Sequence, residues 1–449
     1  MHKQFITLQP HRIPVGFFYI YPMKKIIAIS ALLLVNSMSA QFKIYIDAPA
    51  GFSPKEVYLY SLNGSKDILT TKEMRKGNGW QIDVTKPYSG MMKLYFPEGN
   101  ISVNFISENK DVKLKFDTAN GKISNIGYLD ESNFLMNNIQ DIQQKKEYIL
   151  PALVQIKDYY KADTQFRKSL ETEISRLSSD TQDISKFPFI NYYNTNYAKY
   201  VEKNPAKKPL THEEIIDFLV KSNDMLETSS LMRPVLLAYL NIGPSTNVSA
   251  DIDKLLKAVN TETPRGQTVL SELIEIFDVY EMKDLKNKYL TEATNLKCTI
   301  NDRLAGTIAI NKNTEIGAKF PDYVFNKATN TAAKSVAGVK ADKKVIVFWA
   351  STCSHCEAEL PKLIEKYSAM KTQKIEVIAF SLDNEKSAYD NKVKNLPWIN
   401  DTELKGWYSS YADTYNVRAT PSYFVLDSNN TIIAKPDHAA DVISYLKLN

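Results

Sequence analysis

Cysteine is scarce in this chain: 449 residues contain three of them, Cys298, Cys353 and Cys356. Small secreted proteins without a large core are held together by many disulfides, and this chain is not of that class. Glycine is also rare, with 15 residues, and no low-complexity tract or clear internal repeat is visible. The chain is therefore predicted to fold into globular domains held by their cores, which leaves its cysteines available for chemistry.

A strong charge of either sign is also missing. The chain has 56 basic and 51 acidic residues and a net charge of +5. This is too small and too evenly mixed an excess to indicate binding to nucleic acid or to a membrane surface. Apolar residues make up 44% and charged residues 24%, as in globular proteins. At about 100–200 residues per domain, this length predicts two to four domains.

The apolar run nearest the N-terminus is short. A basic start, Met23-Lys24-Lys25, precedes the apolar stretch 26–35, and small residues follow up to Ala40. These three parts are typical of a signal peptide, and we predict cleavage near Ala40–Gln41, with cleavage after Ser39 as the alternative. The apolar run is too short to span a bilayer comfortably. Residues 1–40 thus predict a periplasmic or otherwise exported protein whose mature chain has no integral membrane span.

Residues 1–22 do not resemble the basic start of a signal peptide, so we take Met23 as the true first residue. An uncleaved N-terminal anchor or a buried strand is the alternative to a cleaved signal peptide in residues 23–40. No cysteine lies at the predicted cleavage site, and a lipid anchor is not expected there.

The mature chain divides into three regions by hydrophobic period. Residues 41–125 contain short runs of alternating apolar and polar residues and a hairpin-type turn at 62–65, which predicts a small antiparallel sandwich or barrel. The β-like runs cover residues 42–46, 57–60, 80–84, 92–96, 101–106 and 112–116.

Residues 126–312 change to the helical period of three to four residues. Thr211 followed by Glu214 is predicted to form a capping box at the start of a helix. The leucine and tyrosine stripes of this region are expected to form its core, and Cys298 is expected to be a buried free thiol. We predict an all-α middle domain without chemistry of its own.

Residues 313–449 alternate between strand and helix patterns, which predicts a central sheet covered on both faces. The expected strands are 343–349, 375–381, 423–426 and 431–434, and the expected helices are 357–371, 388–394, 407–415 and 439–447. The fold class is thus multidomain α+β: an N-terminal β-rich domain, an all-α middle domain and a C-terminal α/β domain.

Cys353-Ser354-His355-Cys356 lies between the strand pattern that ends at Trp349 and a helix pattern. Two cysteines at this spacing can close a small disulfide and open it again. At the start of a helix, the dipole and free backbone N–H groups stabilise a thiolate, and the thiolate is the nucleophile of thiol–disulfide exchange.

The segment 348–361 resembles the active-site segment of the TlpA/ResA branch of the thioredoxin superfamily. Residues 317–323 resemble the upstream segment of that branch, and 419–425 resemble its cis-proline loop. The resemblance covers about residues 313–449 and implies a thioredoxin-like fold. The three-domain arrangement is also similar to exported proteins of Bacteroidetes-type bacteria.

The resemblance implies a role for several residues. Cys353 would be the attacking thiolate and Cys356 the resolving thiol, so the only redox group would be the Cys353–Cys356 disulfide, without a further cofactor. Trp349 would pack beside the site. Pro421 would be in cis, and the exposed backbone of Thr420 would pair with an extended substrate chain.

Two further positions are expected to tune the thiols. Glu359 stands at the position of the characteristic acidic residue of the branch, where it would relay protons to Cys356; a solvated surface glutamate is the alternative. Ordinary thioredoxins have an acidic residue where this chain has Val347. His355, next to Ser354, would stabilise the thiolate and favour an oxidant, whereas the family resemblance favours a reductant.

Other interpretations of the cysteine pair are weaker. Zinc needs about four ligands, and no second paired motif exists, so no metal is predicted. A structural disulfide over four residues would stabilise little, and no peroxidatic Pro-Thr-Cys pattern surrounds Cys353.

We therefore expect an exported thiol–disulfide oxidoreductase that reduces disulfides of client proteins and receives electrons from a membrane thiol relay. The alternatives are a disulfide-forming oxidase or isomerase, or a partner-binding protein with an accessory redox domain.

Overall fold

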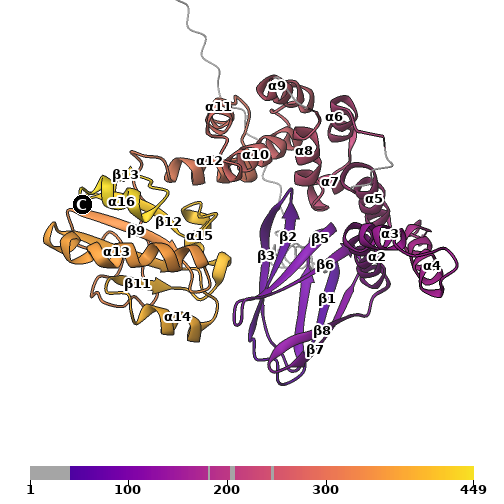
Figure 1. Cartoon of the computed structure of the whole chain (residues 1–449), viewed down its shortest axis with the longest axis horizontal. Coiled ribbons are helices and arrows are strands. Elements are labelled where there is room, and N and C mark those ends of the chain that lie inside the picture. The colour runs from indigo at the N-terminus through magenta and orange to yellow at the C-terminus, as the bar shows by residue number, and fades with distance from the viewer. Residues whose placement is uncertain (1–40, 180–182, 203–207, 244–246, 449) are drawn as a thin grey trace, which may run out of the picture. The chain divides into compact units, whose positions relative to one another are not determined.

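The computed structural model describes residues 41–179, 183–202, 208–243 and 247–448. The predicted signal peptide, its cleavage site and the proposed start at Met23 lie outside these residues. The described chain holds a β-sheet region, a helical middle and a mixed α/β domain in this order (Figure 1), which confirms the predicted fold class. None of the helices within the described ranges is both long enough and apolar enough for a membrane span.

The N-terminal region is a sandwich of two four-stranded sheets, with strand orders β4-β1-β7-β8 and β3-β2-β5-β6. Alternate residues of most strands face a shared core, as in β1, where Phe42, Ile44 and Ile46 are buried. The strands are β1 Phe42–Asp47, β2 Glu56–Asn63, β3 Lys66–Met74, β4 Gly79–Val84, β5 Ser89–Phe96, β6 Ile101–Glu108, β7 Val112–Ala119 and β8 Lys122–Tyr128.

The prediction for this region needs two corrections. The sandwich is not wholly antiparallel, because β1 pairs with β7 in parallel. Strands β3 and β8 were not predicted, because they lie at sheet edges and their side chains are largely solvated. The predicted turn does join β2 to β3, and Gly64 has a φ of +67° there, a conformation that glycine adopts without strain.

The middle region is built from amphipathic helices around one core. Thr211 and Glu214 form the predicted capping box of α6. The helices are α2 Glu131–Tyr148, α3 Leu150–Lys157, α4 Gln165–Ser179, α5 Pro188–Asn196, a π-helical turn Tyr197–Val201, α6 His212–Lys221, α7 Met225–Thr228, α8 Met232–Leu240, α9 Val248–Val259, α10 Pro264–Val279, α11 Lys283–Thr294 and α12 Asp302–Asn313.

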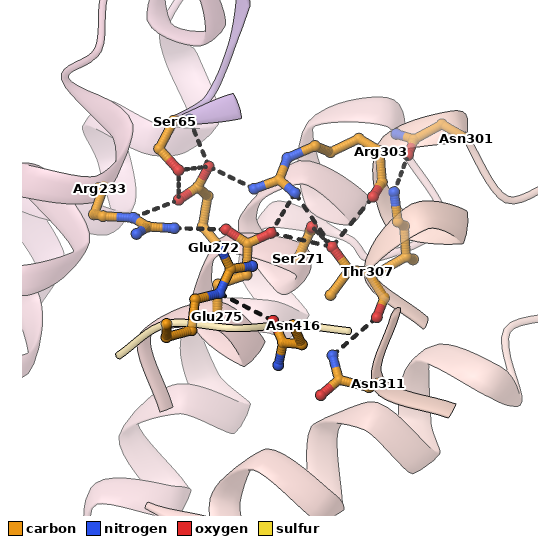
Figure 2. A network of polar contacts seen from close by, with 12 residues as sticks. Ser65, Arg233, Ser271, Glu272, Glu275, Asn301, Arg303, Thr307, Asn311 and Asn416 are labelled. Carbon is orange, nitrogen blue, oxygen red and sulfur yellow. Dashed lines mark hydrogen bonds and ion pairs between the residues drawn. The ribbon is translucent and has the colours of Figure 1, made fainter. Parts of the chain in front are cut away.

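A buried ionic network ties α8, α10 and α12 together (Figure 2). Glu272 is fully buried and contacts Arg303 and Arg233, each at 3.0 Å, and Arg303 also pairs with Glu275. Burial would raise the pKa of Glu275, but the bond from Arg303 outweighs it and keeps that pKa low. The backbone N–H of Ser65 donates to Glu272 at 2.6 Å. Buried charges are stable only when paired, so this network couples the β2–β3 turn to the helical region.

The C-terminal domain has a five-stranded sheet in the order β11-β10-β9-β12-β13. Strands β9, β10 and β11 run parallel, and β12 and β13 are antiparallel additions. Its elements are β9 Lys343–Trp349, α13 Ser354–Thr372, β10 Ile375–Ser381, α14 Lys386–Val393, β11 Ile399–Thr402, a 3-10 turn Gly406–Tyr408, α15 Ser410–Thr414, β12 Ser422–Asp427, β13 Ile432–Ala434 and α16 Ala439–Tyr445.

The two faces of this sheet are both covered. Val345, Val347 and Trp349 of β9 belong to one buried cluster, and the alternating Ile346 and Phe348 belong to another. This confirms the predicted two-sided sheet. The helix predicted over 407–415 is wrong: the segment is a 3-10 turn followed by the five-residue α15. Strand β11 was not predicted, since its sequence Ile-Asn-Asp-Thr lacks an apolar run.

Candidate active site

The two cysteines of the CxxC motif lie where β9 ends and α13 begins. Cys353 is the N-cap residue of α13, and its Sγ accepts a hydrogen bond from the backbone N–H of Cys356 at 3.1 Å. Cys353 is partly exposed, whereas Cys356 is buried, with 1% of its surface exposed. One thiol can therefore reach a partner, and the other can reach only its neighbour.

The surroundings move the pKa values of the two thiols apart. Burial would raise the pKa of Cys353, but hydrogen bonds from the Cys356 thiol and from backbone N–H groups of the first helical turn outweigh it and lower that pKa. Burial, and then the hydrogen bond with Cys353, raise the pKa of Cys356 to about 12. The exposed sulfur is thus the better nucleophile and the buried one holds its proton.

The cis-proline loop faces the cysteines, as predicted. The Thr420–Pro421 peptide bond is cis, and the Cys353 thiol lies 3.2 Å from the carbonyl oxygen of Thr420. The segments 353–356 and 419–421, far apart in the sequence, therefore form one site.

The residues predicted to pack beside the thiols or to tune them occupy different environments. Trp349 is buried against Tyr389, with ring centroids 6.2 Å apart, and belongs to the same core cluster as Cys356. Ser354 and His355 are exposed on the first turn of α13. The structure thus places Trp349 under the site and the imidazole on its surface.

Glu359 is half-buried and already engaged. One carboxylate oxygen accepts from Lys362 Nζ at 2.7 Å and the other from the backbone N–H of Ala439 at 2.6 Å. Burial would raise the pKa of Glu359, but these hydrogen bonds outweigh it, and the pKa is lowered. Glu359 therefore joins α13 to the start of α16 as a carboxylate.

Asp383 is a site residue that the sequence reasoning missed. It is 4% exposed and accepts hydrogen bonds from the Ser351 backbone N–H at 3.0 and 3.1 Å and from the Ser351 hydroxyl at 2.6 Å. The Ser381 hydroxyl donates to it as well. Its position just after β10 was the available signal, because carboxyl ends of adjacent parallel strands meet at one edge. Asp383 thereby holds the loop that leads into Cys353.

Replacing Asp383 with alanine is expected to lower the free energy of unfolding by about 1–3 kcal/mol, because the Ser351 donors are left unpaired. Urea denaturation of the variant and of a Ser387→Ala control, at an exposed position of the same segment, measures this. A wild-type midpoint for Asp383→Ala would show that the loop is held by other contacts.

The side chains that could bind a metal ion do not gather into a site in the described part of the chain. Within the residues that the structure describes, no group of three or more His, Cys, Asp or Glu side chains is placed to hold a metal ion. Cys298 lies in the helical region beside Gln267, with an N–S distance of 3.3 Å. It is a free thiol but only partly buried, which corrects the prediction of a buried one.

Comparisons with known proteins agree with this geometry. Residues 342–432 match the family model described as thioredoxin-like. The C-terminal domain is thioredoxin-like and distantly related to ResA. Over 121 residues it is 25% identical to the thiol-disulfide oxidoreductase ResA of Bacillus subtilis, which covers 26% of this chain and 64% of that protein. For ResA of Bacillus cereus the identity is 27% over 133 residues, 29% of this chain and 74% of that protein.

Solved structures are similar to about a third of the chain. The thioredoxin domain of a thiol-disulfide oxidoreductase from Bacteroides vulgatus aligns with 19% identity and a TM-score of 0.27, over 30% of this chain and 96% of its own. A domain of a possible thiol-disulfide isomerase from Cytophaga hutchinsonii aligns with 27% identity and a TM-score of 0.27, over 30% and 91%. The residues matched by the thioredoxin-like family model, 342–432, all lie in the C-terminal domain.

Proposed function

We propose that this protein is an exported thiol–disulfide oxidoreductase that reduces disulfides of client proteins. The observation that carries the proposal is the asymmetry of the two thiols. Cys353 is accessible, has a lowered pKa and lies 3.2 Å from the Thr420 carbonyl, and Cys356 is buried beside it with a raised pKa. The relation to ResA thiol-disulfide oxidoreductases supports this chemistry.

The reaction follows from the positions of the two sulfurs. The Cys353 thiolate attacks one sulfur of the client disulfide, which forms a mixed disulfide and releases the other client sulfur as a thiolate. Cys356 then loses its proton and attacks the Cys353 sulfur. The client leaves with two thiols, and Cys353 and Cys356 form a disulfide. The client gains two electrons, and the protein must regain them from a donor.

The cellular setting is part of the proposal and rests on the N-terminal sequence pattern. Export would place the site in an oxidising compartment. The electrons for each further cycle would then come from a membrane thiol relay. Because the two cysteines complete the electron balance, the proposal includes no other cofactor.

The test uses the chain that begins at Gln41 and measures both its activity and the direction of electron transfer. We expect it to catalyse the reduction of insulin by dithiothreitol, and we expect equilibration with dithiothreitol buffers to give a potential near the thioredoxin value of about −270 mV. A potential near about −120 mV, together with oxidation of reduced proteins, would instead support an oxidase or isomerase. The exposed His355 on the first helical turn favours that second function. Absence of both activities would refute the proposal.

We also propose that Glu359 helps to move the proton of Cys356. Replacing Glu359 with glutamine is expected to shift the pH dependence of Cys356 reactivity, because a carboxylate near the thiol disappears. Thiol titration of the variant checks this. Glu365→Gln is the matched control, since Glu365 lies on the same helix with a largely exposed side chain. An unchanged titration would leave Glu359 as a structural link between α13 and α16.

A further inference from the structure

A cleft of about 700 Å³ lies between the sandwich and the C-terminal thioredoxin-like domain, which we call the redox domain in view of its proposed function. Its sandwich wall comes from β6, β8, the turns that precede these two strands, and the segment just before β2, and its other wall is Asn384 and Glu385. Lys122 and Glu385 face each other across it, with a 3.9 Å Nζ–Oε1 distance. We call this space the β6–β8 cleft.

The cleft opens at the same edge of the redox domain as the cysteines. Trp349 and Ser381, the last residues of β9 and β10, are register partners in a parallel pair. The CxxC loop follows β9, and the cleft wall follows β10. Between them, Asp383 holds Ser351, two residues before Cys353. The cleft wall and the CxxC loop therefore follow the ends of two adjacent strands.

Residues 406–408 of the C-terminal domain contact β5, β6 and the turn between them. Tyr408 stacks on Tyr95 with centroids 4.1 Å apart, and its hydroxyl lies 3.2 Å from the Ser102 hydroxyl. The amide nitrogen of Asn100 would be 3.2 Å from a Cβ at Gly406. Strand β6 is thus held against the redox domain.

Among the strands that the structure describes, β6 lies at the edge of its sheet. In the order β3-β2-β5-β6 it has a strand neighbour on one side only, as β8 has in its own sheet. Farther along β6, the outer edge is occupied: Asn133 bonds both the N–H and the C=O of Ile106, and the Tyr128 hydroxyl donates to Asn104. Backbone groups two residues apart point to the same side of a strand. The N–H and C=O of Ser102 therefore point outward into the cleft.

The side chains beside this edge fit the same kind of ligand. Ile101, Ile123 and Ile126 line the cleft and are half-buried, so they offer apolar surface next to the free backbone groups. An open strand edge combined with pockets for alternate side chains is the requirement for adding an extended chain to a sheet.

We propose that the β6–β8 cleft binds an extended, apolar segment of the client polypeptide, which adds to the edge of β6 through the backbone of Ser102. This inference rests on the proposed function, because it names where the protein client is held while Cys353 attacks it. It assigns client binding to the sandwich and gives a reason for the contact between the edge of β6 and residues 406–408.

The first test separates the Ser102 backbone from its side chain. Ser102→Pro removes the N–H at an edge position, where proline is tolerated, and Ser102→Ala removes only the hydroxyl. The substrates are a short peptide of alternating valine and threonine whose single cysteine is disulfide-bonded to thionitrobenzoate, and Ellman's reagent alone. We expect Ser102→Pro to raise KM for the peptide about five- to tenfold, with unchanged kcat and unchanged reaction with Ellman's reagent. Ser102→Ala, which loses only the contact with the Tyr408 hydroxyl, should raise KM clearly less than Ser102→Pro does.

A second measurement does not depend on a folded proline variant. The peptide is trapped as a mixed disulfide on the Cys356→Ser chain, and backbone hydrogen exchange is followed along β6. The Ser102 amide should exchange at least about tenfold more slowly in the trapped state, whereas Val103, which points toward β5, should be unchanged.

Three outcomes would overturn the inference: equal KM values for the proline and alanine variants, no added protection at Ser102, or protection that depends on protein concentration, which would indicate a second copy of the chain on β6. The failure of the proposed function looks different, because the wild-type chain would then reduce neither insulin nor the peptide.

Discussion

Serine at position 353 is expected to reduce the disulfide-reductase rate by at least about 10³-fold, because the attacking sulfur is lost. Serine at position 356 is expected to stop turnover as well, but at a later step. The mixed disulfide with Cys353 still forms, and no thiol remains nearby to resolve it. The Cys356→Ser chain should therefore accumulate client proteins attached through Cys353.

Non-reducing gels and mass spectrometry of the Cys356→Ser chain, incubated with insulin, check this order of events. Cys298→Ser is the control, because Cys298 lies in the helical region and should change neither rate nor adducts. Client adducts on the Cys353→Ser chain instead would reverse the roles of the two cysteines.

The second large effect is a difference in alkylation rates. At pH 8, a thiol with a pKa of about 12, as for Cys356, is a thiolate in about one molecule in 10⁴. The pKa of Cys353 is instead lowered, so a far larger share of this thiol is thiolate at the same pH. Iodoacetamide should thus modify Cys353 about 10³-fold faster than Cys356.

The pH dependence of alkylation shows the direction in which the pKa of Cys353 is shifted. The alkylation rate of Cys353 should rise with pH while the thiol is protonated and level off above its pKa, earlier than for an ordinary cysteine. Peptide mapping after timed quenching separates the three cysteines. Similar rates for Cys353 and Cys356 between pH 6 and pH 8 would contradict the proposed asymmetry.

Local sequence patterns correctly predicted the strands and helices that are buried on a regular face. The predicted strands 343–349 and 375–381 coincide with β9 and β10. A short apolar run of this kind is typical of a strand that is buried on both faces of a sheet. Predictions were wrong or missing at edges and short turns: β3, β8 and β11 carry too little apolar sequence, and residues 407–415 show a helical spacing that tertiary contacts divide into two short turns.

The sequence by itself located the candidate thiol site of this protein. Two cysteines two residues apart at a strand–helix junction, with Thr420-Pro421 farther along, were enough to predict a thiol site and its nucleophile. That is possible because the helix N-terminus and the CxxC spacing are local properties.

Only the tertiary structure decided what surrounds that site. Asp383 holds the CxxC loop because two parallel strands end side by side, and Glu359 is bound to Lys362 and to the start of α16. The sandwich edge at Ser102 lies beside the redox domain through contacts between residues some 300 positions apart, such as Ser102 with Tyr408. Such contacts depend on how whole sheets pack, and no pattern within one strand or helix contains that information.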